Sequence, residues 1–342
     1  MPPLYITTQG AKLRYGGRRL VVEKDGKEIA ALPAVHVDRV LIFGNVGLTT
    51  PALSYLLETG IDTVFMTLRG RFKGRLVGPD GGNGRLRLHQ YERASDESWA
   101  LETARAIVKV KLHNTRTLLR RYARRLGQKE LAPEDTSDLS AAADRLGELI
   151  ARADRCRTVN SLSGVEGTGA AVYFSRFRQL IQGDAWEFSG RNRRPPRDPV
   201  NALLSFGYTV VANNVEAAVR AAGLDPYIGF LHQPAYNRPN LALDLMEEFR
   251  AIVVDSVVLR CLNANLIRPE HFQVIPDGVN PVLLTDEGRT TFIRELEARF
   301  KLEFTHPVSK ERVTYRRCFE LQARMMARCI QNGRIYEPFR VH

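Results

Sequence analysis

The stretch that decides the fold is "SDESWALETARAIVKVKLHNTRTLLRRYARRLG", residues 95–127. Its apolar side chains recur every three or four positions among arginines and lysines, which predicts a long amphipathic helix with one buried stripe. The expected stripe contains Trp99, Ile107, Leu118, Leu119 and Tyr122. The chain before this helix has the period of strands, whereas the chain after it is helical. The sequence therefore predicts an α+β protein, in which a small β-rich domain precedes a larger all-α domain.

Residues 1–88 are expected to form the β-rich domain. Runs such as "PLYITT" (3–8) and "VDRVLIFGN" (37–45) have the composition of strands. The pair Asp25-Gly26 lies between two further runs and favours a tight hairpin turn. The stretch "TTPALSYLLETG" (49–60) predicts one short helix, with a threonine cap before it and a glycine after it. We place a linker at residues 89–95, after the glycine-rich "PDGGNG".

Residues 96–342 are expected to form a larger all-α domain. After the long helix, further helices are predicted at 137–155, from about Gly164, at 198–223 with Asp198 as cap and Pro199 first, at 241–262, at 286–300 and through Gln331. The remaining residues are expected to form a loose end without an assigned role.

Composition limits the classes of function. The net charge of +12 favours a polyanionic partner, although many surface arginines also simply solvate a protein. The sequence has no apolar run close to the length of a membrane span and no signal segment, so we expect a cytoplasmic protein without a membrane partner. The four cysteines are far apart in the sequence, which indicates neither a zinc ribbon nor a disulfide framework.

One acid, Glu166, stands among glycines in "GVEGTGAAVYFSRF" (164–177), at the predicted start of a helix. Each glycine costs a helix roughly 1 kcal/mol relative to alanine, so the cluster indicates that something approaches this backbone closely. A neighbouring helix, a nucleic-acid backbone or a metal ion would each favour small residues here. Only the last two would also favour the carboxylate. The structural alternative is an acid that lies near the positive amino-terminal end of a helix.

Two later stretches carry further candidates. His232 lies in the loop "GFLHQPAYNRPN" (229–240), and Asp244 and Glu247 lie three residues apart in "LALDLMEEFR" (241–250). Residues at this spacing share one face of a helix. A divalent metal that acts on phosphodiesters takes carboxylate oxygens, sometimes with an imidazole, from separate elements. A hydrogen-bonded structural histidine and a surface acid pair remain the alternatives for each stretch alone.

Three blocks together resemble a known family. They are "NSLSGVEGTGAAVYFSRF" (160–177), "RNRRPPRDPVNALLSFGYTVV" (191–211) and "GFLHQPAYNRPNLALDLMEEFR" (229–250). In this order and at these spacings they are similar to the signature blocks of the first-numbered CRISPR-associated protein family, the endonuclease and integrase subunits of spacer acquisition. The resemblance covers nearly the whole chain, and it implies the same two-domain layout.

The resemblance also implies roles for particular residues. It assigns Glu166, His232 and Glu247 to a site for Mg²⁺ or Mn²⁺, and Asp244 to a further acid that supports the site or the catalysis. Glu248 is the alternative to Glu247, although it would point about 100° away on the same helix. Polar residues that line the same cavity, or that instead form hydrogen bonds between helices, are Asn201 and Ser205.

The implied reaction is the insertion of short duplex spacers into a CRISPR repeat, by attack of a DNA 3′-hydroxyl on a phosphodiester. Cleavage follows when water attacks instead. The implied partners are double-stranded and branched DNA, a second copy bound through the sheet domain, and a small companion nuclease-fold protein of the adaptation complex. A non-catalytic DNA-binding scaffold and a related mobile-element integrase remain alternatives. Candidate contacts to DNA phosphates are Arg191, Arg193, Arg194, Arg197, Arg120, Arg121, Arg124 and Arg125.

Overall fold

The structure is a computed structural model that describes residues 3–68, 70–78, 83–128, 133–193, 195–232, 236, 238–276 and 281–341. The chain divides into two compact units, Met1–Gly82 and Asn83–His342. The expected linker at 89–95 is corrected, because these residues belong to helix α2 (Gly84–Ser95). The Asn83 side chain caps this helix by accepting a hydrogen bond from the Leu86 amide (3.2 Å). Leu86 and Gln90 then bury one face of it.

The first unit contains two four-stranded sheets. In one, three strands run parallel and the last is antiparallel; its order is β1 (Leu4–Ile6), β5 (Arg39–Phe43), β7 (Asp62–Met66) and β8 (Phe72–Leu76). The other has the order β4 (Lys27–Pro33), β3 (Arg19–Lys24), β2 (Lys12–Gly16) and β6 (Gly47–Leu48). Along the chain, η1 (Ala34–His36) follows β4 and α1 (Thr50–Glu58) follows β6. The prediction of a strand-rich amino-terminal region is confirmed.

Local sequence signals explain the turns of this unit. Strands β3 and β4 pair from Lys24 to Lys27 across Asp25 and Gly26, whose φ angles are 51° and 74°. These left-handed angles suit glycine and aspartate, as a two-residue hairpin turn requires. Helix α1 begins after Thr49, whose side chain accepts the amide hydrogen of Ala52 (3.4 Å). The predicted hairpin turn and the predicted threonine cap are both confirmed.

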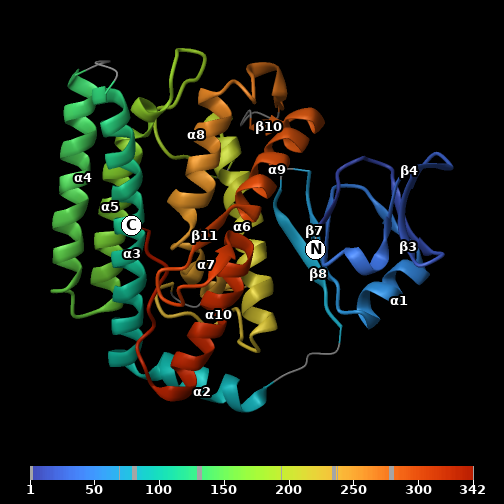
Figure 1. Cartoon of the computed structure of the whole chain (residues 1–342), viewed down its shortest axis with the longest axis horizontal. Helices are drawn as coiled ribbons and strands as arrows, with labels where there is room; N and C mark the ends of the chain where they lie inside the picture. The colour runs from blue at the N-terminus through green and yellow to red at the C-terminus, as the bar shows by residue number, and fades with distance from the viewer. Residues whose placement is uncertain are drawn as a thin grey trace. The chain divides into compact units, whose positions relative to one another are not determined.

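The second unit is largely helical. Three of its helices lie side by side (Figure 1): α3 (Glu97–Gln128), α4 (Pro133–Ala153) and α5 (Val159–Arg176). The others are η2 (Phe177–Leu180), α6 (Pro199–Ala221), α7 (Asn240–Met246), η3 (Arg250–Asp255), α8 (Ser256–Asn263), η4 (Pro269–His271), α9 (Asp286–Lys301) and α10 (Tyr315–Asn332). Helix α6 is buried along most of its length and starts at the predicted Asp198 cap, whose side chain accepts from the Asn201 amide (2.8 Å).

Helix α5 starts earlier than the sequence suggested. The side chain of Thr158 accepts from the Ser161 amide (3.2 Å), and this cap places the first residue at Val159. Glu166 therefore lies two turns inside the helix, beyond the reach of its positive amino-terminal end. The glycines also differ from one another: a side chain at Gly169 would collide with Leu112 of α3, whereas Gly164 faces open space. Packing explains Gly169 and leaves the glycines beside Glu166 without a packing role.

The predicted helix at 241–262 is interrupted. Helix α7 ends at Met246, a turn follows at 247–249, and the π-helical η3 leads into α8. In the turn, the amides of Glu247 and Phe249 bond three residues back, to Asp244 (3.2 Å) and Met246 (2.9 Å). Hydrophobic periodicity could not show this break, because the residues on both sides of it are buried.

The sequence did not predict two short strand pairs within the helical unit. They are β9 (Phe272–Val274) with β10 (Val282–Leu284), and β11 (Glu303–Thr305) with β12 (Arg312–Thr314). Strands of three residues are too short to give a periodic signal. Within the described ranges, the structure contains no helix with both the length and the apolar character needed to cross a bilayer.

Candidate active site

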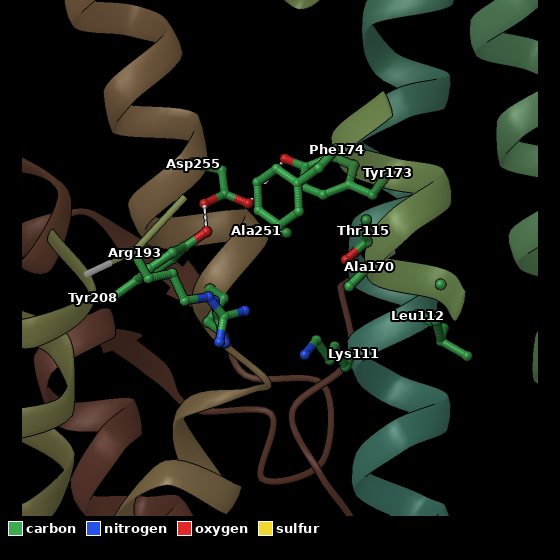
Figure 2. A pocket seen from close by; sticks show the side chains of 12 residues that line it. Lys111, Leu112, Thr115, Ala170, Tyr173, Phe174, Arg193, Tyr208, Ala251 and Asp255 are labelled. Atoms are coloured by element: carbon green, nitrogen blue, oxygen red, sulfur yellow. Dashed lines mark hydrogen bonds between the residues drawn. The ribbon is translucent and has the colours of Figure 1, made fainter. Parts of the chain in front are cut away.

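Two of the predicted acids meet on one cation. Glu166 lies on α5, Glu247 opens the turn after α7, and Lys111 lies on α3. The Lys111 ammonium is 2.6 Å from Oε2 of Glu247 and also forms an ion pair with Oε1 of Glu166. Figure 2 shows Lys111 pointing from α3 into the space between the helices. Residues that are far apart in the sequence thus bring two carboxylate groups to a single positive charge.

Glu247 is held in its charged form. Its side chain is 3% exposed, and Oε1 accepts a hydrogen bond from Arg250 (2.9 Å). Burial alone would raise the pKa of this carboxyl, but Arg250, Lys111 and His232 outweigh burial and hold the pKa far below its ordinary value. A carboxylate that stays ionised while buried has the character of a cation ligand.

The second oxygen of Glu247 gives a test of whether a metal ion fits. Oε2 is buried, and its partner is the Lys111 ammonium 2.6 Å away. A buried carboxylate needs a cation or hydrogen-bond donors close by, and here a single ammonium group supplies that charge. Mg²⁺ and Mn²⁺ favour carboxylate oxygens of this kind. The donor set therefore fits a hard divalent ion at the position of the ammonium group.

His232 is oriented by Asp244. The Nδ1 atom of the ring is 2.6 Å from Oδ1 of Asp244, which also accepts from the His232 amide (3.1 Å). The other oxygen of Asp244 accepts from the amides of Phe230 (2.6 Å) and Leu231 (2.9 Å). This carboxylate is fully buried, and a side chain at Gly229 would collide with it. Asp244 therefore has the contacts of a positioning residue, with its oxygens already engaged.

The position of His232 relative to the two acids is looser than the sequence suggested. His232 acts on Glu247 electrostatically and borders an open pocket lined by Arg157, Thr158 and Phe230. In the parts of the chain that the structure describes, no three histidine, cysteine or acidic side chains are close enough to hold a metal ion. The structure thus brings together two of the three predicted ligands and leaves the imidazole beside them.

The arginine-rich loop before α6 is tied down internally. Arg191 donates to Asn201 (2.6 Å) and to Ser205 (3.0 Å), and burial lowers the pKa of Arg191 to about 10. Asn201 is fully buried and also bonds to Gly190 (2.8 Å) and Asp198 (2.6 Å). These contacts give Asn201 and Ser205 a structural role, but their partners lie in the loop and not on a neighbouring helix as the alternative expected.

Other predicted DNA contacts are accessible. Arg193 and Arg197 are exposed on the same loop, and Arg194 lies outside the described residues. On α3 the four arginines of the basic face are exposed: Arg120, Arg121, Arg124 and Arg125. Arg120 forms an ion pair with Asp144 (3.1 Å), which partly neutralises its positive charge.

A small pocket of about 20 Å³, roughly the space for one water molecule, is lined by Lys111 and Arg250, which pair with the two acids (Figure 2). Lys111, Arg193 and Arg250 contribute cations to its lining. At its far wall Asp255 accepts from the hydroxyls of Tyr173 (2.9 Å) and Tyr208 (2.5 Å), and burial raises the pKa of Asp255 to about 6. Three cations on the wall of one pocket suit a phosphate group.

Lys111 was not predicted as a site residue. It lies four residues from both Ile107 and Thr115, which are buried. A lysine within the apolar stripe was therefore the available signal.

A strand-rich unit is followed by a helical unit, in which a buried acid and a partly exposed acid pair with one cation beside a basic pocket. These features define a class of protein suited to chemistry on phosphate groups. The chain matches the family described as CRISPR associated protein Cas1 over residues 4–298. It is 41% identical over 339 residues to the CRISPR-associated endonuclease Cas1 1 of Thermus thermophilus, with 98% of each chain covered. The protein belongs to the Cas1 family.

Other comparisons agree with this assignment. The chain is 39% identical to a CRISPR-associated exonuclease Cas4/endonuclease Cas1 fusion of Geobacter sulfurreducens, with 95% of this chain and 58% of the fusion covered. It superposes on a chain of a solved Cas6-RT-Cas1–Cas2 complex with a TM-score of 0.83 and 26% identity, over 100% of this chain and 36% of the other. A casposase bound to an integration product shares the fold, with a TM-score of 0.85 at 21% identity and coverage of 98% and 93%.

Proposed function

We propose that this site transfers phosphoryl groups at DNA phosphodiesters with the help of Mg²⁺ or Mn²⁺. As a Cas1 family member, the protein is an endonuclease and integrase of CRISPR adaptation. The observation that carries the proposal is the meeting of Glu166 and Glu247 at one cation, beside a pocket with a basic lining.

The metal ligands in the proposal are Glu166, Glu247 and His232. When bound, the ion would polarise the phosphodiester and stabilise the negative charge of the transition state. The ion would take the place of the Lys111 ammonium between the two carboxylates, and the ammonium would then be available to a phosphate oxygen. Because Nδ1 of His232 is held by Asp244, Nε2 is the ring nitrogen that would bind the ion.

The chain's own groups then orient the reaction. Arg193 and Lys111 hold the phosphate, and the oxygen of a DNA 3′-hydroxyl forms a bond to phosphorus while the opposite P–O3′ bond breaks. The attacking hydroxyl gives its proton to solvent water, and water also protonates the leaving 3′-oxygen while Nε2 of His232 is engaged as a ligand. An unliganded His232 would be the proton donor instead. Water as the nucleophile gives cleavage by the same geometry.

The proposal includes partners. The exposed Arg120, Arg121, Arg124 and Arg125 extend the basic surface along which duplex or branched DNA would lie. A second copy would pair through the first unit, where the edge strand β4 and the following turn expose Ile29, Leu32 and Val35. A companion Cas2-type protein is inferred from the name of the related complex. The reaction would take place in the cytoplasm, where its DNA substrates lie.

The experiment that tests the proposal compares Glu166→Ala and Glu247→Ala with the exposed control Glu187→Ala in Mn²⁺. We expect both site variants to lose joining of a duplex spacer to repeat DNA, while their DNA binding and the activity of the control are retained. Unchanged joining by the two site variants would exclude this site and leave a non-catalytic scaffold.

A further inference from the structure

The end of the chain is anchored, which corrects the expected loose end. After α10 the backbone turns at Gly333 (φ 65°), and residues 334–341 run without helix or strand alongside the helical unit (Figure 1). We call residues 334–341 the carboxy-terminal strap. Tyr336 and Phe339 of the strap are each only 2% exposed. An irregular segment buried as deeply as a core helix must make specific polar contacts to satisfy its backbone.

The strap forms hydrogen bonds to the side chain of Glu248. The Tyr336 hydroxyl donates to Oε1 (2.5 Å), and the Phe339 amide donates to Oε2 (2.6 Å). Gln322 of α10 adds a third hydrogen bond, to Oε2 (2.9 Å). Glu248 is fully buried, and all three donors are neutral. A carboxyl group in this position serves to hold the strap, because its neighbour Glu247 faces the cations instead.

The backbone of the turn is tied to the strap as well. The Asn114 side chain donates to the carbonyl oxygens of Glu248 (2.8 Å) and Phe339 (3.0 Å), and it accepts from the Val341 amide (3.1 Å). The rings of Phe249 and Phe339 stack with their centroids 5.7 Å apart and 15° between their planes. One asparagine on α3 thus joins the turn to the strap.

These contacts surround the interruption between α7 and η3, where Glu247 lies. The turn at 247–249 lies between α7 and the π-helical η3, and such interruptions are frequent at functional sites. Asn114 lies one helical turn from Lys111 on α3, on the same face. Holding Glu248 and Phe249 from outside therefore fixes the direction of Glu247 toward Lys111.

We propose that the carboxy-terminal strap is a positioning element of the catalytic centre: it clamps Glu248 and Phe249 and so aims Glu247 at the phosphate pocket. Glu248, Asn114 and Tyr336 are the positioning residues. This inference rests on the proposed function of Glu247, and it assigns a role to a segment that touches neither the pocket nor the predicted metal ligands.

The test uses full-length protein with Glu248→Ala, the milder Glu248→Gln and Tyr336→Phe. The control Glu337→Gln removes an exposed strap carboxylate. Measured quantities are kcat and KM for strand joining, Mn²⁺ affinity from the electron paramagnetic resonance of the free ion, DNA affinity, and folding by circular dichroism. We expect Glu248→Ala to lower kcat and Mn²⁺ affinity by roughly 10- to 100-fold, as removal of an orienting group does. Glu248→Gln and Tyr336→Phe should show smaller losses, with KM for DNA unchanged.

The proposal is overturned if folded Glu248→Ala keeps kcat and Mn²⁺ affinity within about twofold of wild type, the range of ordinary surface substitutions. Should Glu248→Ala fail to fold, Glu248→Gln and Tyr336→Phe decide by the same criteria. Failure of the proposed function looks different, because Glu247→Ala would then join DNA normally. An inactive Glu247→Ala with fully active strap variants rejects the strap alone.

Discussion

Glu247 and Glu248 are neighbours on one turn, yet they lie in opposite environments. Glu247 faces Lys111 and Arg250, and these cations keep it charged. Glu248 faces neutral donors of the strap and α10, and burial raises its pKa to about 7. Both are buried, so burial does not distinguish the acid suited to a metal from the acid that holds structure. The charge of the surrounding groups does.

The largest expected effect on the rate of strand joining comes from removing the charge of Glu247 while keeping the shape of its side chain. Glu247→Gln should lower the single-turnover rate of strand joining roughly 10²- to 10³-fold, the scale of losing one electrostatic contact in a transition state. Affinity for DNA should be retained. Rapid-quench assays with labelled spacer measure the rate, and an unaltered rate would remove Glu247 from the reaction.

Asp255 resembles Glu248, because its hydrogen bonds come from the neutral hydroxyls of Tyr173 and Tyr208. Its pKa is raised from 3.8 to about 6, so the folded protein binds this proton more tightly than the unfolded chain does. This contribution to stability is fully present below pH 3.8 and is lost as the pH rises to about 6. The loss amounts to about 3 kcal/mol.

Asp255→Asn should therefore flatten the pH dependence of the free energy of unfolding across this window. Urea titrations at a series of pH values, with wild type alongside, measure the slope. An equal slope in both proteins would mean that Asp255 ionises normally when folded.

A substitution at Asp244 tests whether this residue only orients His232 or itself contacts the reacting groups. Asp244→Asn leaves the shape but weakens the bond that orients His232, so joining should slow by roughly 10- to 100-fold. Glu247→Gln should be the more damaging change. Single-turnover assays on both variants compare them, and a greater loss in Asp244→Asn would mean that Asp244 itself touches the reacting groups.

The smallest effect is expected at Lys111. In Lys111→Met two carboxylates lose their shared cation, so Tm of the metal-free protein should fall by about 2 to 4 °C. Added Mn²⁺ should then raise Tm more in the variant than in wild type. Differential scanning fluorimetry measures both shifts, and equal responses to Mn²⁺ would mean that the ammonium and the ion do not share a position.

Much of the fold could be predicted from local signals. The Asp25-Gly26 turn, the threonine cap of α1 and the Asp198 cap of α6 each act within a few residues, and the structure has all three. The linker prediction at 89–95 failed because Asn83 starts a helix just after the glycines. The two short strand pairs were not predicted, because three-residue strands are too short to show a hydrophobic period.

The site shows where sequence reasoning stops. Glu166 and Glu247 were predicted from the resemblance of three sequence blocks to a known family, and the structure brings them to one cation. Lys111, Asn114 and the strap were not predicted, because their roles depend on tertiary contacts between residues far apart in the chain. A periodic pattern reports which side of a helix is buried, and it does not report what that side meets.

The most direct test is a crystal soaked in Mn²⁺ and measured at the manganese absorption edge. The account predicts an anomalous peak between the carboxylates of Glu166 and Glu247, with the Lys111 ammonium displaced from both. A peak elsewhere, or Lys111 still lying between the two carboxylates at saturating Mn²⁺, would contradict it.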